Sequence, residues 1–172
     1  MLQPYDYSCS ARATRWASTR ATLVGSAAKN CCGPKFWPKE AVAADEAAIK
    51  EAAAEKGAVT YRATERMDWN AVVVLMLKEG TGKSPTVADK IDMHYSGALL
   101  NGTVFDEHLK GAPITFPLNG LIYGMQIGLA QLKEGAKAKI TIPFRLGYVE
   151  AAMAKIPPYS TLVFTVELVA VK

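Results

Sequence analysis

Apolar and polar residues alternate along several short stretches of the chain, which is the pattern of a half-buried β-strand. Within residues 90–96, Met93 and Tyr95 fall on the apolar face and polar residues fall on the other. Asn101-Gly102 follows and is typical of a type I′ hairpin turn, because both residues tolerate a positive φ. Alternation or a continuous apolar run predicts further strands over residues 59–64, 71–77, 137–142 and 162–171.

A helix is predicted ahead of the strands, over residues 38–57. Pro38 suits the first turn, Glu46 and Lys50 form a favourable i,i+4 pair, and Gly57 fits the C-terminal cap. Its few apolar residues are mostly alanine, so this helix is expected to pack weakly. We interpret it as a solvated spacer, with a docking helix for a partner protein as the alternative.

A shorter helix is predicted over residues 124–132, where Met125, Leu129 and Leu132 lie on one face. Strands therefore outnumber helices, and the predicted fold class is α+β with an antiparallel sheet. The chain divides into three parts: an extended arm (1–38), the alanine-rich helix (39–58) and one folded domain (59–172).

Positive charge is concentrated in the arm. The chain has a net charge of +4, and six basic residues but no acidic one occur between Tyr7 and Lys39. A nucleic-acid-binding face needs basic residues clustered with aromatic ones on a folded surface, so no nucleic-acid partner is expected. The longest apolar run, residues 71–77, is far shorter than the ~20 residues that cross a bilayer. No membrane span is expected either.

The arm is rich in Arg, Ser, Thr and Ala, a composition that resembles an organellar transit peptide. It has too few apolar residues to order by burial within its own chain. We expect it to lie extended on the acidic surface of a larger assembly contacted through residues 1–58, anchored by Trp16, Phe36 and Trp37. Folding back on its own domain is the alternative.

Every cysteine of the chain also lies in the arm. Cys9, Cys31 and Cys32 fit no zinc-binding pattern, and no histidine is near them. They are interpreted as free thiols, with a bridge from Cys9 to Cys31 or Cys32 as the alternative. No metal site is predicted.

Aromatic and apolar residues of the folded domain follow one another in a characteristic order. The order is Tyr95, Phe105-Asp106, Leu121-Ile122, Tyr148, Ile156-Pro157-Pro158 and Phe164. It resembles the FKBP family of peptidyl-prolyl cis-trans isomerases over roughly residues 75–171, and the run from Leu77 to Pro85 is similar to the macrophage infectivity potentiator branch. The resemblance implies a sheet curled around one short helix, with an apolar cup that binds proline.

The resemblance also implies roles for individual residues. Tyr148 would donate a hydrogen bond to the carbonyl before the proline, and Asp106 would hold Tyr95 or polarise the rim, which makes Tyr148 and Asp106 the catalytic candidates. Ile114 stands where the family often has a phenylalanine. The predicted substrate-binding residues are Tyr95, Phe105, Ile114, Leu121, Ile122, Met125 and Phe164. Because isomerases of this family recur in the thylakoid lumen, a plastid is expected slightly ahead of a mitochondrion.

Rotation about an X–Pro bond needs no nucleophile, metal or cofactor, and none is predicted. The barrier of ~20 kcal/mol comes from amide resonance. Resonance favours a charge-separated form that water stabilises, so an apolar pocket raises the planar state relative to the twisted one. Buried aromatic residues with one or two hydroxyl groups therefore suffice.

Two departures from the family pattern bear on the expected rate of isomerisation. Met125 occupies the position at the pocket floor where the most active members have tryptophan, and methionine keeps the floor apolar but flexible. Residues 143–149 read Pro-Phe-Arg-Leu-Gly-Tyr-Val instead of the usual Pro-Pro-Asp-Leu-Ala-Tyr-Gly. The prediction is therefore an isomerase of reduced activity on proline-containing segments. The alternative is a structural or binding subunit of an organellar assembly.

Overall fold

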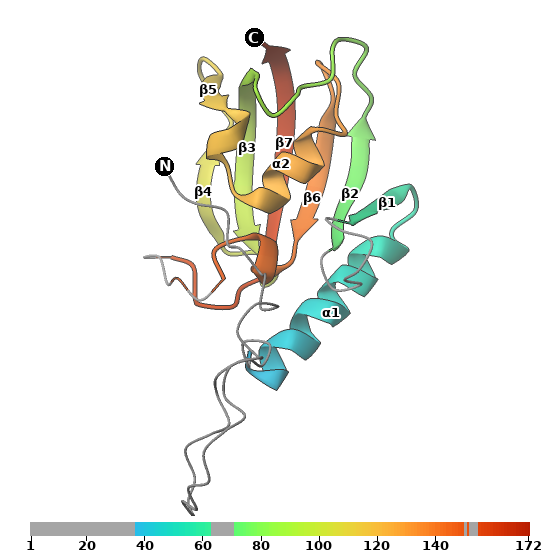
Figure 1. Ribbon diagram of the computed structural model, residues 1–172, viewed down its shortest axis with the longest axis vertical. Coiled ribbons are helices and arrows are strands. Elements are labelled where there is room, and N and C mark those ends of the chain that lie inside the picture. Colours follow the sequence, from blue (N-terminus) through green and yellow to red (C-terminus); the bar gives the residue numbers. More distant parts are fainter. Residues whose placement is uncertain (1–36, 63–70, 150, 152–154) are drawn as a thin grey trace, which may run out of the picture. The chain divides into compact units, whose positions relative to one another are not determined.

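The computed structural model describes residues 37–62, 71–149, 151 and 155–172 (Figure 1). Residues 38–172 form one compact unit. The predictions for the arm, including its cysteines, Trp16 and Phe36, lie outside the described residues.

The compact unit begins with helix α1 (Lys39–Ala54), where a helix was predicted, and continues into a seven-stranded sheet that carries a second helix. In chain order the further elements are β1 (Ala58–Arg62), β2 (Ala71–Lys78), β3 (Lys90–Leu99), β4 (Val104–His108), β5 (Ile114–Pro117), the 3-10 turn η1 (Leu118–Gly120), α2 (Tyr123–Leu129), β6 (Lys137–Ile142), the 3-10 turn η2 (Phe144–Leu146) and β7 (Leu162–Val171).

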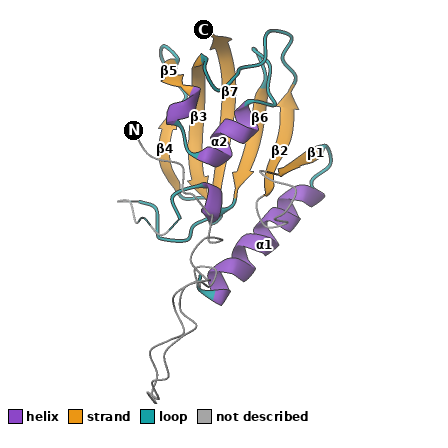
Figure 2. Cartoon of the chain, in the orientation of Figure 1, coloured by secondary structure: helices purple, strands orange, loops and turns teal. Residues whose placement is uncertain are grey.

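The sheet is antiparallel throughout, so the predicted α+β class is confirmed (Figure 2). The strand order is β1-β2-β6-β7-β3-β4, and β5 pairs with the other end of β3. Strand β3 is therefore flanked by β7 on one side and by β4 and β5 on the other. Gly97 of β3 lies opposite Phe164 of β7 and Asp106 of β4, which brings three distant parts of the chain to one place.

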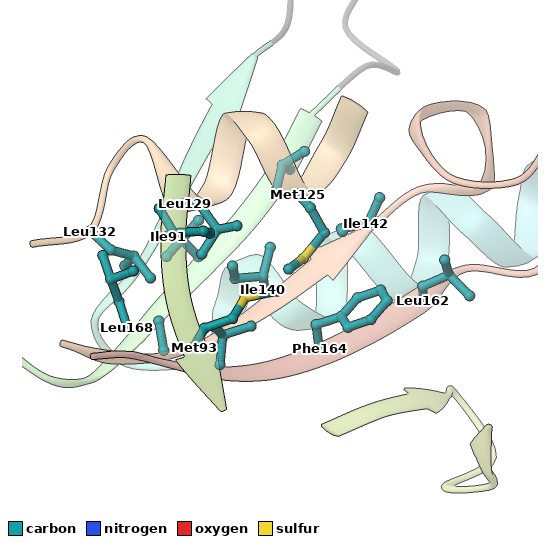
Figure 3. Close-up of a cluster of buried hydrophobic side chains, with 14 of the residues drawn as sticks. Ile91, Met93, Met125, Leu129, Leu132, Ile140, Ile142, Leu162, Phe164 and Leu168 are labelled. Atoms are coloured by element: carbon teal, nitrogen blue, oxygen red, sulfur yellow. The ribbon is translucent and has the colours of Figure 1, made fainter. Parts of the chain in front are cut away.

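The hydrophobic core lies between the sheet and α2. Helix α2 crosses one face of the sheet (Figure 1) and contacts β2 and β6. Its buried side chains Met125 and Leu129 meet Ile140 and Ile142 of β6 in the main cluster (Figure 3). The helix ends at Leu129, three residues earlier than predicted, yet Leu132 beyond it is fully buried.

Helix α1 packs on the opposite face of the sheet, and the spacer interpretation is wrong for its inner side. Val73 of β2 and Thr141 of β6 lie opposite each other in the sheet. Both alternate with core residues along their strands, so they point to the face away from α2, and both are nevertheless buried. Helix α1 contacts β1, β2 and β6 and turns buried Asp45, Ala48 and Ala52 inward. Small alanine side chains allow a close approach of the helix to the sheet, which the weak apolar pattern did not indicate.

An ion pair fixes the C-terminal end of α1 to the same face. Lys139 Nζ lies 2.6 Å from Glu55 Oε1, and both side chains are about one third exposed. Glu55 is the residue at which α1 ends. None of the helices in the described part of the chain is long and apolar enough to span a membrane.

Candidate active site

The candidate residues are brought together by β3, β4, β7, the start of α2 and the segment after η2. Met125 and Phe164 belong to the buried core cluster, and Tyr95, Phe105, Leu121, Ile122 and Tyr148 pack against it as half-buried side chains. Asp106 is exposed. The term aromatic cluster is used below for Tyr95, Phe105, Ile122, Met125, Tyr148 and Phe164. Because these side chains come from five separate segments, their meeting depends on the whole fold.

Phe105 and Phe164 form one wall of the aromatic cluster. Their ring centroids are 5.5 Å apart and the ring planes meet at 82°, which is a favourable edge-to-face arrangement. Gly97 lies on the strand between them. A Cβ atom on Gly97 would lie 2.6 Å from the Phe105 ring and 2.8 Å from the Phe164 ring. The contact between the two rings therefore requires glycine at this position.

Tyr95 and Asp106 form a polar pair beside this wall. The Tyr95 hydroxyl donates a hydrogen bond to Asp106 Oδ2 over 2.8 Å. Partial burial, followed by the hydrogen bond and the negative charge of Asp106, raises the pKa of Tyr95 to about 12. The phenol therefore stays neutral to a more alkaline pH than a free tyrosine does, and its hydrogen bond to Asp106 fixes the direction of the hydroxyl group.

Strand β5 places an aromatic side chain that was not predicted, Phe116, next to Tyr95. Ile114 is half-buried on β5, opposite Met93 in the ladder. The residue that meets the Tyr95 ring is Phe116, edge to face at 6.0 Å and 70°. The two residues are two positions apart on one strand and therefore point to the same face, so the sequence pattern alone does not separate their roles.

The backbone at Leu121 and Ile122 is largely occupied. The Leu121 carbonyl accepts a hydrogen bond from the Gln126 side chain at 2.8 Å, and the Leu121 N–H donates to Leu118. The Ile122 carbonyl accepts from the first turn of α2, at Met125 and Gln126. Within the described part of the chain, the Ile122 N–H is the backbone group of this pair that keeps its hydrogen-bonding capacity. The Ile122 N–H is therefore the one donor of this pair that is available for the predicted backbone contact to substrate.

Met125 lies at the base of the aromatic cluster. Its side chain is 3% exposed, and Figure 3 shows it reaching from α2 toward Ile142 and Phe164. Its role as the floor of a proline-binding cup stays a prediction. Its thioether offers no rigid flat surface against which a proline ring could be held.

Tyr148 follows η2 and is half-buried. Burial, and secondarily the nearby Asp106 carboxylate, raises the pKa of Tyr148. Its hydroxyl makes no hydrogen bond to any described residue. A neutral phenol with a free O–H group next to apolar rings can donate a hydrogen bond to a ligand carbonyl.

The arrangement suits binding and desolvation rather than covalent chemistry. It offers two donors, the Tyr148 hydroxyl and the Ile122 N–H, on residues that belong with Phe105 and Phe164 to one packed cluster. No cluster of metal-binding side chains occurs among the residues that the structure describes. Sequence reasoning missed Gly97 and Phe116. Gly97 could have been recognised from its position, since a glycine inside an alternating strand indicates a close approach by other atoms.

Comparison with known proteins agrees with this geometry. Residues 81–169 match the family model of the FKBP-type peptidyl-prolyl cis-trans isomerase. The chain is 44% identical over 98 residues to the FKBP-type 22 kDa peptidyl-prolyl cis-trans isomerase of Escherichia coli, covering 56% of this chain and 48% of that protein. It is 43% identical over 105 residues to the peptidyl-prolyl cis-trans isomerase Mip of Coxiella burnetii, covering 60% and 46%.

Solved structures show the same similarity. The crystal structure of FkpA from Escherichia coli superposes with a TM-score of 0.69 at 36% identity, covering 78% of this chain and 60% of that one. A peptidyl-prolyl cis-trans isomerase from Pseudomonas syringae gives a TM-score of 0.68 at 28% identity, covering 81% and 99%. The chain spans about half the length of the curated relatives it matches. With more than half of its residues inside the family model, the chain belongs to the FKBP-type peptidyl-prolyl cis-trans isomerase family.

Proposed function

We propose that this protein is a peptidyl-prolyl cis-trans isomerase that acts on proline-containing peptide segments. The observation that carries the proposal is the pair of free donors, the Tyr148 hydroxyl and the Ile122 N–H, beside the wall of Phe105 and Phe164. Family membership of residues 81–169 supports the same reaction.

The chemistry follows from the amide group. A planar X–Pro amide is stabilised by resonance, and water stabilises the charge-separated form. Against the Phe105 and Phe164 rings the amide loses that water, which lowers the cost of twisting it. A hydrogen bond from Tyr148 or Ile122 to a substrate carbonyl holds the chain while the bond rotates. Each ~1.4 kcal/mol of such stabilisation is worth about tenfold in rate.

Reduced activity is part of the proposal. The floor residue Met125 is buried but flexible, so it holds the proline ring less firmly than a flat aromatic side chain would. A twisted transition state that is held less firmly is stabilised less, so rotation is slower. The rate is therefore expected to be measurable but low.

The test is cis-to-trans exchange of a short proline peptide, followed by NMR with and without the protein. Acceleration in proportion to protein concentration is expected, and Tyr148→Phe should lower it without unfolding the domain. Tyr61→Phe is the matched control, because it removes the same hydroxyl from β1, away from the aromatic cluster. An exchange rate equal to that of the free peptide would overturn the proposal.

A binding subunit of a larger organellar assembly is the second candidate, favoured by the same methionine floor and by the basic arm. The inner side of α1 packs against its own sheet, so the proposed contact through residues 1–58 would use the outer side of α1 together with the arm, residues 1–38. Deleting these residues should abolish co-purification with an assembly if the arm is the tether. Fusing the first 40 residues to a fluorescent reporter tests the organellar location, and a purely cytosolic signal would contradict it.

A further inference from the structure

A buried carboxylate outside the family segment reaches the backbone next to the candidate active site. Asp45 lies in the middle of α1, before the segment at residues 81–169, and is 2% exposed. Burial raises the pKa of this carboxyl group, and hydrogen bonds from Thr161 and Phe144 counteract part of the effect. A buried carboxylate is costly unless several donors satisfy it, and Asp45 has such donors.

The donors come from the two ends of the segment that carries Tyr148. Asp45 Oδ1 accepts a hydrogen bond from the Phe144 N–H at 3.1 Å and from the Thr161 hydroxyl at 2.5 Å. Asp45 Oδ2 lies 3.9 Å from Arg145 Nη1, and the Arg145 side chain is 8% exposed. One side chain of α1 therefore joins the beginning of η2 to the beginning of β7.

The backbone of Phe144 links this contact to the neighbours of Tyr148. Its N–H donates to Asp45, while its carbonyl accepts from the N–H groups of Gly147 at 3.1 Å and Val149 at 3.0 Å. Those two residues are the immediate neighbours of Tyr148. The direction of the Tyr148 side chain is therefore set by a backbone turn whose first N–H is held by Asp45.

The other end of the segment leads to the wall of the aromatic cluster. Thr161 directly precedes β7, and Phe164 follows three residues later. A movement of Thr161 would thus shift the ring that meets Phe105. Arg145 adds charge to the same contact and lies 4.9 Å from the Phe144 ring centroid, which limits the freedom of η2.

We propose that Asp45 is a positioning residue of the active site, which holds the Tyr148 turn and the start of β7 in the geometry that isomerisation requires. The inference rests on the proposed isomerase function. Helix α1 then contributes to catalysis by positioning active-site residues, although it lies outside the family segment. Asp45 itself touches no substrate and acts through Phe144 and Thr161.

The experiment compares Asp45→Ala with Asp45→Asn in the peptide exchange assay. The alanine variant leaves the Phe144 N–H and the Thr161 hydroxyl without their acceptor, and kcat/KM should fall about tenfold. The asparagine variant keeps an acceptor oxygen and should retain kcat/KM within about threefold of the unmodified protein. Glu55→Ala is the matched control, because it breaks a different side-chain link between α1 and the sheet, the ion pair of Glu55 with Lys139.

A double-mutant cycle separates positioning from a merely structural role. In the Tyr148→Phe background, Asp45→Ala should lower kcat/KM by clearly less than about tenfold, because one of the two routes through which it acts has been removed and the route through Thr161 and β7 remains. A full tenfold loss in that background would overturn the proposal, and so would equal losses for Asp45→Ala and Glu55→Ala. All rates are taken at a temperature where circular dichroism shows every variant folded. Should Asp45→Ala fail to fold, Thr161→Val replaces it in the same cycle.

A second readout does not depend on catalysis. The backbone amide signals of Gly147, Tyr148 and Val149 should shift and exchange faster with solvent in Asp45→Ala than in Glu55→Ala. If the unmodified protein does not accelerate peptide exchange but these signals respond, the proposed function fails and the positioning contact stands. Unchanged amide signals in an active protein would refute the positioning role alone.

Discussion

The Tyr95 hydroxyl donates a hydrogen bond to the carboxylate of Asp106, 2.8 Å away, across the pair of strands β3 and β4. Partial burial and this pair together raise the pKa of Tyr95 to about 12, against 10 for a free tyrosine. Between those values the unfolded chain loses the Tyr95 proton while the folded protein keeps it. Stability therefore decreases as the pH rises through this interval.

The first prediction concerns that alkaline loss. The midpoint of urea unfolding should fall between pH 10 and pH 12 in the unmodified protein. Lysine residues also titrate in this range, so the informative quantity is the difference from Tyr95→Phe. The variant should show a smaller loss, and parallel curves for the two proteins would contradict the assignment.

A second prediction tests the wall of the aromatic cluster. Gly97→Ala places a methyl group 2.6 Å from the Phe105 ring and 2.8 Å from the Phe164 ring, and overpacking of this kind costs about 1–3 kcal/mol. The isomerase rate should fall together with the free energy of unfolding, because both rings must move.

Gly102→Ala is the control for Gly97→Ala. Gly102 has a φ of +83° and no neighbouring atom within 4 Å of a built Cβ, so its cost arises from the backbone alone. It should lower stability by about 1 kcal/mol and leave the rate unchanged. An equal effect of both variants on the rate would contradict the steric explanation.

The third prediction concerns Val149, which follows Tyr148. Its φ of 57° lies in the left-handed region, which is unfavourable for a β-branched residue. Val149→Gly should raise the free energy of unfolding by about 1 kcal/mol, or Tm by about 2–4 °C, measured by calorimetry. Val149→Ala keeps the Cβ atom and should gain less. An equal gain from alanine would assign the effect to packing instead of φ.

A fourth prediction tests the floor of the cluster. Met125→Trp should raise kcat/KM, because a flat indole ring holds the proline more firmly than a thioether does. Met125 is 3% exposed, so the larger side chain should also cost about 1–3 kcal/mol of stability. Met125→Leu controls for the loss of sulphur and should not raise the rate. If both the unmodified protein and Met125→Trp leave the peptide exchange rate unchanged, the binding-subunit alternative is favoured.

The strands with clear alternation were predictable from the sequence, since the apolar face of β3 is buried as the pattern indicated. Strand β5 was not predicted, because it is short and half-exposed and carries little periodic signal. Strand β4 was indicated only by the Asn101-Gly102 hairpin turn that precedes it. The order of aromatic residues indicated Tyr95, Phe105, Tyr148 and Phe164. It could not indicate Gly97 or Phe116, whose roles depend on contacts between strands.

The packing of α1 was the largest departure from prediction. A prediction from the local sequence treats α1 as exposed, because it finds a charged Asp45 among alanine residues. The partners that neutralise the cost of burying this carboxylate, Phe144 and Thr161, are far away along the chain. A local sequence pattern shows that burying the charge of Asp45 costs free energy. It does not show the hydrogen-bond donors that offset this cost.

The distance along the chain between α1 and its partners also constrains how the protein is made. Asp45 is separated by 99 residues from Phe144 and by 116 residues from Thr161. At a synthesis rate of about 5–20 residues per second, the helix leaves the ribosome several seconds before its acceptor groups find their donors. During that interval the inner side of α1, with its carboxylate and alanine residues, is open to chaperones. The hydrogen bonds of Asp45 therefore form late, and the rate of translation determines how long they are missing from the nascent chain.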